Sequence, residues 1–182
     1  MAEIAELREP YPGDFIQPSE NGDIGVPSTD IFVGKRVLEG FFHTDAEELD
    51  PETKTKQRYA HFLLERVVGN ELPFSTIHTT RETLNIAITS LGHGNGDRGG
   101  ADDCLEKVRE SDVFEIHHCS SAEYESVVSD FLEYRPREIS IQEAVLANIA
   151  KSVDITHVAT WDSDFTRYTD ELTLYPRNYW GS

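Results

Sequence analysis

The chain has 182 residues, a formal net charge of −18 at pH 7, and two cysteines that form no C-x-x-C or zinc-finger motif. Its length fits one ordinary α/β domain, and it contains neither the roughly 18 consecutive apolar residues of a membrane span nor the features of a signal peptide. These properties exclude a membrane protein, a disulfide scaffold and a zinc finger, and we expect a cytoplasmic protein with reduced thiols.

Acidic side chains are spread among apolar positions instead of forming a separate tail, which indicates a folded protein with an acidic surface. Such a surface repels itself in dilute buffer. At about 1 M salt the Debye length falls to about 3 Å, and this repulsion largely disappears. The charge therefore predicts a salt-rich cytoplasm, such as that of a halophilic archaeon.

The chain begins with a segment that is rich in proline and glycine and poor in periodic apolar positions. We expect residues 1–22 to form an extended or mobile arm, followed by a single domain over residues 23–182. A first strand of this domain leads into Asp30-Ile31-Phe32-Val33, and a helix is predicted over residues 35–42.

A long helix is predicted over residues 51–68, because Asp50 can serve as its N-cap and Pro51 as its first residue. The remaining chain predicts strands at 72–77, 113–117, 155–160 and 172–174 and helices at 80–91, 122–134 and 141–153. Strands that alternate with helices of this length form βαβ units. The fold class is therefore α/β, a three-layer α/β/α arrangement with a mostly parallel central sheet of about five strands.

A glycine-rich stretch over residues 92–100 interrupts this alternation. Gly94, Gly96 and Gly99 satisfy the spacing G-x-G-x-x-G of a dinucleotide site. However, the stretch follows a predicted helix and not a strand, so the structural context of that motif is missing. We expect a mobile surface loop instead.

Four acids lie near the ends of the predicted elements: Asp30, Glu82, Glu143 and Asp162. The carboxyl ends of parallel strands and the starts of the following helices share one edge of a sheet, so these side chains could converge there. Crowded carboxylates repel one another unless a cation neutralises them. Oxygen ligands suit Mg²⁺ or Mn²⁺ better than zinc, and Asp164 offers a further carboxylate.

Each acid also has a purely structural interpretation. Glu82 and Glu143 each stand third after a Thr or Ser, which is the spacing of a helix-capping box. Asp162 and Asp164 could cap a turn, and Asp30 could be an ordinary exposed acid. The order of all these acids along the chain is more informative than any one of them.

The C-terminal half carries a distinctive pattern. Glu143-Ala144 opens a helix on which Ala147 and Ala150 recur. A strand follows and ends in Thr160-Trp161-Asp162-Ser163-Asp164-Phe165, which reads T-x-D-x-D-F. An acid at the start of a helix is thus followed by two acids at the end of the next strand.

Two earlier segments complete the pattern. Ile77-His78-Thr79-Thr80-Arg81-Glu82-Thr83-Leu84 places an acid at a helix start, and Asp30-Ile31-Phe32-Val33 places one near the first strand. Over roughly residues 24–175 the sequence therefore resembles the PIN-domain family of ribonucleases, which includes VapC-like toxins. That family usually has Asp-Thr-Asn/Ser-Val after an apolar strand, and here Ile31 and Phe32 replace the polar pair.

The resemblance implies a PIN-like fold and Mg²⁺- or Mn²⁺-dependent hydrolysis of RNA phosphodiester bonds. It implies Asp30, Glu82, Glu143 and Asp162 as catalytic metal ligands, bound directly or through water, with Asp164 as an additional ligand. It also implies an RNA substrate and an antitoxin protein as the partner of a toxin; the sequence leaves open whether the protein forms a homodimer. Membrane association is not expected.

Two other functions are compatible with parts of this pattern. The stretch Asp162-Ser163-Asp164-Phe165-Thr166 also resembles the nucleophile strand of haloacid-dehalogenase-type phosphatases, but that family begins with this strand and only 16 residues follow here. A catalytically degenerate PIN-like module that binds RNA or protein stays open.

Adjacent strand residues point to opposite faces, so we expect His118 and Cys119, like His78, to have structural roles.

Overall fold

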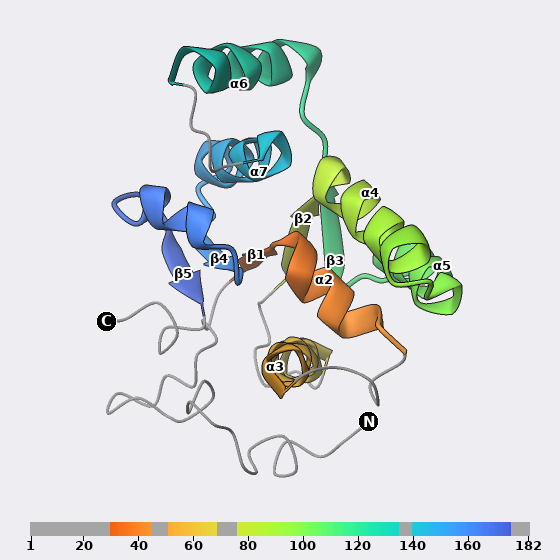
Figure 1. Ribbon diagram of the computed structural model, residues 1–182. Helices are drawn as coiled ribbons and strands as arrows, with labels where there is room; N and C mark the ends of the chain where they lie inside the picture. Colours follow the sequence, from red (N-terminus) through yellow and green to blue (C-terminus); the bar gives the residue numbers. More distant parts are fainter. Residues whose placement is uncertain (1–29, 45–50, 69–75, 135–139, 176–182) are drawn as a thin grey trace, which may run out of the picture.

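The computed structural model describes residues 30–44, 51–68, 76–134 and 140–175 (Figure 1). Five strands form one sheet in the order β3-β2-β1-β4-β5, and every neighbouring pair is parallel. The strands are β1 (Ile31–Val33), β2 (Ile77–Thr80), β3 (Phe114–His117), β4 (His157–Ala159) and β5 (Thr173–Tyr175). The predicted sheet of about five mostly parallel strands is confirmed.

The helices of the described residues cover both faces of this sheet (Figure 1). They are α2 (Lys35–Phe42), α3 (Pro51–Val68), α4 (Arg81–Thr89), α5 (Arg98–Glu110), α6 (Ser121–Tyr134) and α7 (Ile141–Ser152), with a π-helical turn η1 (Ser90–Gly94) and a 3-10 helix η2 (Ser163–Tyr168). One hydrophobic core joins the sheet to α2, α3, α4 and α5, and a second joins it to α6 and α7. The three-layer α/β/α arrangement is therefore confirmed.

The central strand β1 is apolar throughout because it is covered on both sides. Ile31 and Val33 belong to the core under α2 to α5, whereas Phe32 belongs to the core under α6 and α7. All three side chains are at most 1 % exposed. A continuous apolar run is what a strand buried on both faces requires.

The strand β2 lies later in the sequence than predicted. It runs over Ile77–Thr80, and residues 72–75 of the predicted strand lie outside the described residues. Its polar side chains are buried because they have partners: the Thr79 hydroxyl lies 3.4 Å from the carbonyl oxygen of Val33, and Thr80 accepts a hydrogen bond from the amide of Thr83 as the N-cap of α4. A predictor that favours apolar runs misses a strand of this composition.

The expectation of a loop over residues 92–100 is wrong for its helical parts. The π-helical turn η1 extends α4 to Gly94, and α5 already begins at Arg98. Asp97 is the N-cap of α5 and accepts a 2.8 Å hydrogen bond from the amide of Gly100. Buried residues of α5 then recur with helical spacing, at Gly100, Ala101, Cys104 and Val108. The cap and this periodicity outweigh the low helix propensity of the glycines.

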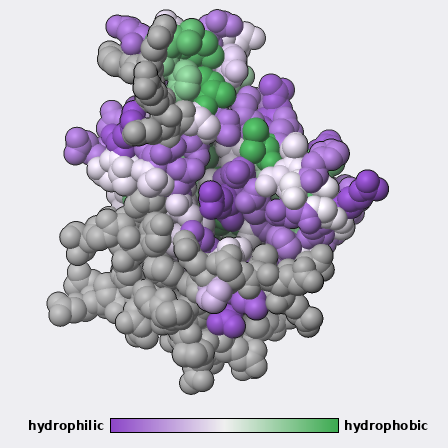
Figure 2. Space-filling model, in the orientation of Figure 1, coloured by the Kyte–Doolittle hydropathy of each residue, from purple (hydrophilic) through white to green (hydrophobic). Residues whose placement is uncertain are grey.

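An apolar region of the surface lies on α6. Figure 2 shows hydrophobic side chains gathered over this helix, and its exposed large hydrophobic residues include Tyr124 at 38 % and Leu132 at 62 % exposure. No helix among the described residues is long and apolar enough to cross a membrane. The predicted arm, residues 1–22, lies outside the described residues.

Candidate functional site

Three carboxylates meet at the carboxyl edge of the sheet. Glu143, Asp162 and Asp164 each offer an oxygen that lies within 4.8 Å of the others. The topology explains this meeting: Asp162 follows the end of β4, and α7 precedes β4 and runs antiparallel to it, so that the start of α7 lies at the same edge. Segments separated in sequence therefore bring their acids together.

Local hydrogen bonds hold two of these side chains in place. The Oε2 atom of Glu143 accepts hydrogen bonds of 2.9 Å from the Ser140 amide and 2.6 Å from the Ser140 hydroxyl. Asp162 Oδ1 accepts a 3.1 Å hydrogen bond from the amide of Asp164, and the Asp162 amide donates to Thr160 Oγ1 at 3.1 Å. The capping interpretation of Glu143 and Asp162 is thus confirmed, and it is compatible with a role in the cluster because it also orients the carboxylates.

The electrostatics of the cluster are those of an acid pair that shares a proton. Burial, and then the hydrogen bond with Asp162, raise the pKa of Glu143 to about 7. Burial also acts to raise the pKa of Asp162, but hydrogen bonds from Glu143 and the Asp164 amide, together with the positive charge of Arg36, lower it overall. Near neutral pH a proton on Glu143 bridges the pair, and a cation can take its place.

This donor set fits a hard divalent cation. All three groups are carboxylates, which is the ligand type that Mg²⁺ and Mn²⁺ prefer. Burial is the main cause of the raised pKa of Glu143, and a cation bound beside this carboxylate would favour its ionised form.

Glu82 lies at the same edge but outside the close group. It is in the first turn of α4, directly after β2, and α4 contacts α7. Its Oε1 atom lies 3.8 Å from Nη2 of Arg81. Its Oε2 atom is buried and has no hydrogen-bond partner in the part of the chain that the structure describes. A buried carboxylate oxygen in this state can accept a water molecule or a ligand.

Asp30 is at the opposite edge, so the structure does not bring it to this group. It precedes β1 instead of following it: Oδ1 accepts a 2.8 Å hydrogen bond from the Thr76 amide, and Oδ2 lies 3.4 Å from Nε2 of His78. The residue that follows β1 is Gly34. A Cβ atom there would lie 3.2 Å from Thr160 Oγ1, which is a tight contact. Of the four acids expected to converge, the structure joins Glu143 and Asp162 and places Glu82 at their edge.

A hollow beside the acidic edge is lined by two basic side chains, Arg36 and Lys56, and by the acid Glu39. Its volume is about 280 Å³. Arg36 also acts electrostatically on Asp162, and the Lys56 amine lies 5.9 Å from the ring centre of Trp161. Arg36 was not predicted as a site residue, although its place in the first turn of the helix after β1 puts it at the carboxyl edge.

Comparison with known proteins supports the fold. No protein-family model matches the sequence, and no curated protein matches it. Among solved structures, the chain is similar to VapC20 of Mycobacterium tuberculosis, a sarcin-ricin loop cleaving toxin, with a TM-score of 0.57 and 20 % identity. The similarity covers 75 % of this chain and 93 % of that chain. At this identity the likeness concerns the fold, and the predicted PIN-like fold is confirmed.

Proposed function

We propose that this protein is a Mg²⁺- or Mn²⁺-dependent endoribonuclease that hydrolyses RNA phosphodiester bonds. The observation that carries the proposal is the meeting of Glu143, Asp162 and Asp164 at the carboxyl edge of a PIN-like sheet. The likeness to VapC20, a sarcin-ricin loop cleaving toxin, supports it. A role as the toxin of a toxin–antitoxin pair is part of the proposal, as are an antitoxin partner, a homodimer and a cytoplasmic location.

Within this proposal Glu143 and Asp162 hold the cation, and Asp164 and Glu82 contribute directly or through water. When bound, the cation makes water a better nucleophile at neutral pH and stabilises negative charge on the phosphate. The chain itself keeps the ligands oriented: Ser140 fixes Glu143, and the Thr160 hydroxyl fixes the turn at Asp162. Asp30 is not assigned to this centre, because it lies at the other edge.

The hollow beside the acids suggests a path for the RNA backbone. Arg36 and Lys56 line it, and the positive charge of Arg36 acts on Asp162, in a protein whose net charge is −18. Long-range attraction of RNA is therefore weak, and local contacts to phosphate matter more. We expect binding in high salt to depend on these two side chains and the cation.

The direct test is RNA cleavage by Asp162→Asn. In molar KCl with Mn²⁺ or Mg²⁺, the unmodified protein should cut looped or single-stranded RNA. Asp162→Asn should lose about 100-fold or more in rate, as does removal of one electrostatic stabiliser from an active site. Asp130→Asn, an exposed acid-to-amide change on α6, is the matched control and should retain activity. Full activity of Asp162→Asn, with its metal dependence unchanged, would refute the assignment.

A second candidate function is a degenerate PIN-like module that binds RNA or a protein without cleaving. The observation that favours it is Gly34, because the family has its first acid after the first strand and here a glycine follows β1. The same assays separate the two functions. A binding module leaves RNA intact with every divalent metal, yet retains RNA in a filter or gel-shift experiment.

A further inference from the structure

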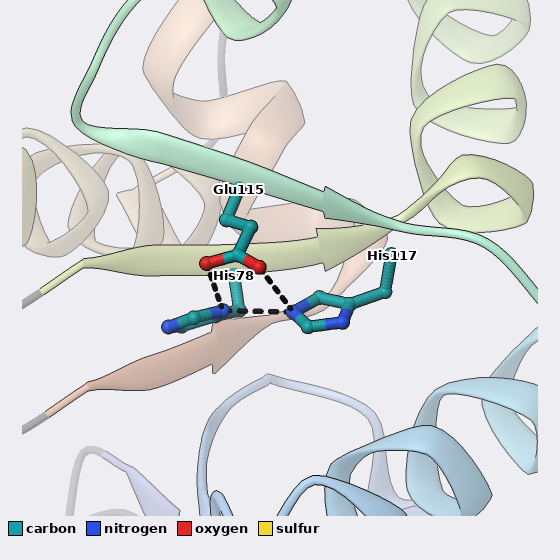
Figure 3. A group of neighbouring side chains, drawn as sticks. All are labelled: His78, Glu115 and His117. Atoms are coloured by element: carbon teal, nitrogen blue, oxygen red, sulfur yellow. Dashed lines mark hydrogen bonds and ion pairs between the residues drawn. The ribbon is translucent and has the colours of Figure 1, made fainter.

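A second group of ligand-type side chains lies on other strands of the sheet (Figure 3). His78 of β2 and Glu115 of β3 are directly paired across the two strands, and His117 is two residues further along β3. Side chains two residues apart on a strand point to the same face. Figure 3 shows all three projecting from one face of the sheet toward one another. Phe32 on β1 packs beside both imidazoles, with ring centroids 5.4 and 5.1 Å away.

The distances are close to those of a metal site. Nδ1 of His78 lies 2.8 Å from Nε2 of His117. Oε2 of Glu115 lies 3.7 Å from Nδ1 of His78, and Oε1 of Glu115 lies 3.9 Å from Nε2 of His117. Zinc–nitrogen bonds of about 2.0–2.1 Å in a tetrahedral site place two nitrogens about 3.4 Å apart. A small rotation of the imidazoles therefore makes room for an ion between the three groups.

Asp30 supplies an independent observation that points to a ligand. The other nitrogen of His78, Nε2, is buried, makes no hydrogen bond among the described residues, and lies 3.4 Å from Oδ2 of Asp30. The Thr76 amide fixes this carboxylate through its other oxygen. Histidines that bind metals commonly direct their second nitrogen at a carboxylate, which sets the tautomer. A proton on Nε2 facing Asp30 leaves the lone pair of Nδ1 pointing toward Glu115 and His117.

The surroundings allow an ion to enter and to be neutralised. His78 is 3 % exposed, the His117 side chain is 15 % exposed, and that of Glu115 is 60 % exposed, so the group is buried at one end and open at the other. Burial, and then His78, lower the pKa of His117, which favours the neutral imidazole that binds metals. Two imidazoles and one carboxylate suit Zn²⁺ and related ions better than Mg²⁺.

We propose that His78, Glu115 and His117 bind a transition-metal ion of the Zn²⁺ type, and that Asp30 positions His78 for this role. The ion fastens the edge strand β3 to β2, because the ligands come from both strands. This site is separate from the acidic cluster of Glu143, Asp162 and Asp164 and does not depend on the proposed ribonuclease activity. It also gives a role to Asp30, which the acidic centre leaves out.

The test is a calorimetric Zn²⁺ titration of the full, untagged chain carrying Asp162→Asn, so that the acidic cluster contributes little. One Zn²⁺ should bind and raise the melting temperature. Added to this chain, Glu115→Gln and His117→Ala should each abolish binding. Asp30→Asn should weaken it by about 10–100-fold. His118→Ala is the matched control, because this exposed neighbour is outside the group, and it should bind as before.

Two results would overturn the proposal. The first is that the Asp162→Asn chain binds no Zn²⁺. The second is that this chain binds Zn²⁺ with equal affinity with and without Glu115→Gln. In either case His78 and His117 would be only a hydrogen-bonded pair. The Glu115→Gln variant keeps the test valid even if His117→Ala does not fold, because the Glu115 side chain is largely exposed. With Co²⁺ as the probe, absorption bands typical of tetrahedral coordination should appear and should disappear in Glu115→Gln.

Discussion

At the scale of single residues, Glu143 combines two roles that the sequence analysis treated as alternatives. One carboxylate oxygen, Oε2, accepts the two hydrogen bonds from Ser140 that cap α7. The same side chain shares a hydrogen bond with Asp162. The S/T-x-x-E spacing predicted the cap from sequence alone. The contact with Asp162 depends on how α7 packs against the end of β4, which no local pattern contains.

The raised pKa of Glu143 predicts how stability depends on pH without divalent metal. In the folded protein the pKa of Glu143 is about 7, whereas the ordinary pKa of a glutamate, expected in the unfolded chain, is 4.5. The contribution of this side chain to stability therefore falls as pH rises from about 4.5 to about 7. Asp162, whose pKa is lowered, does not titrate in this range. In EDTA, Glu143→Gln should therefore be more stable than the unmodified protein at pH 8, by about 1–2 kcal/mol after allowing for solvent screening, and similar at pH 5.

Urea unfolding at the two pH values measures this difference. Asp130→Asn on the exposed face of α6 serves as the control and should keep the pH dependence of the unmodified protein. A Glu143→Gln protein that is less stable than the unmodified one at pH 8 would show that the pair does not share a proton.

At the scale of elements, the outcome of sequence analysis depended on how locally each element is encoded. The helices α2 and α3 have the predicted bounds, because N-terminal residues and apolar spacing mark them directly. The strand β2 and the helix α5 were misplaced or missed, since buried threonines and adjacent glycines are acceptable only with their tertiary partners. Asp30 was expected at the carboxyl edge of the sheet, because the bounds of β1 could not be located from sequence. In the structure β1 begins after Asp30.

The start of α5 offers a matched pair of substitutions. A Cβ atom at Gly100 would collide with the carbonyl oxygen of Phe42 and lie 2.5 Å from Asp97 Oδ2, whereas one at Gly99 would make an ordinary 3.8 Å contact. Gly100→Ala should lower the free energy of unfolding by about 1–3 kcal/mol through overpacking and damage to the Asp97 cap. Gly99→Ala should be neutral or stabilise by up to about 1 kcal/mol. Denaturant unfolding of both variants gives the comparison, and equal effects would contradict the packing described for α5.

At the scale of the whole molecule, the sequence predicted the layers of the fold better than the site. Alternating strands and helices led directly to a parallel sheet with helices on both faces. The pairing of β2 with β3 was not predictable from periodicity. For that reason the sequence analysis assigned His78 a structural role and did not connect it with Glu115 and His117.

The net charge of −18 leads to a prediction for the molecule as a whole. Repulsion among surface carboxylates destabilises the folded state in dilute buffer, and at about 1 M salt the Debye length is only about 3 Å. The free energy of unfolding should therefore rise between dilute buffer and molar KCl. Thermal or urea unfolding, without guanidinium salt, measures this free energy in both conditions. A fall in stability with added KCl would contradict the proposed adaptation to a salt-rich cytoplasm.

The central claim is that the acids at the carboxyl edge hold a divalent cation, and anomalous X-ray diffraction from a crystal soaked in Mn²⁺ tests it most directly. We expect a manganese peak bonded to the carboxylates of Glu143 and Asp162, with Asp164 or Glu82 reaching it directly or through water. The peak should be absent from crystals of Asp162→Asn. A crystal saturated with Mn²⁺ that shows no peak at this edge would rule out a cation site formed by these acids.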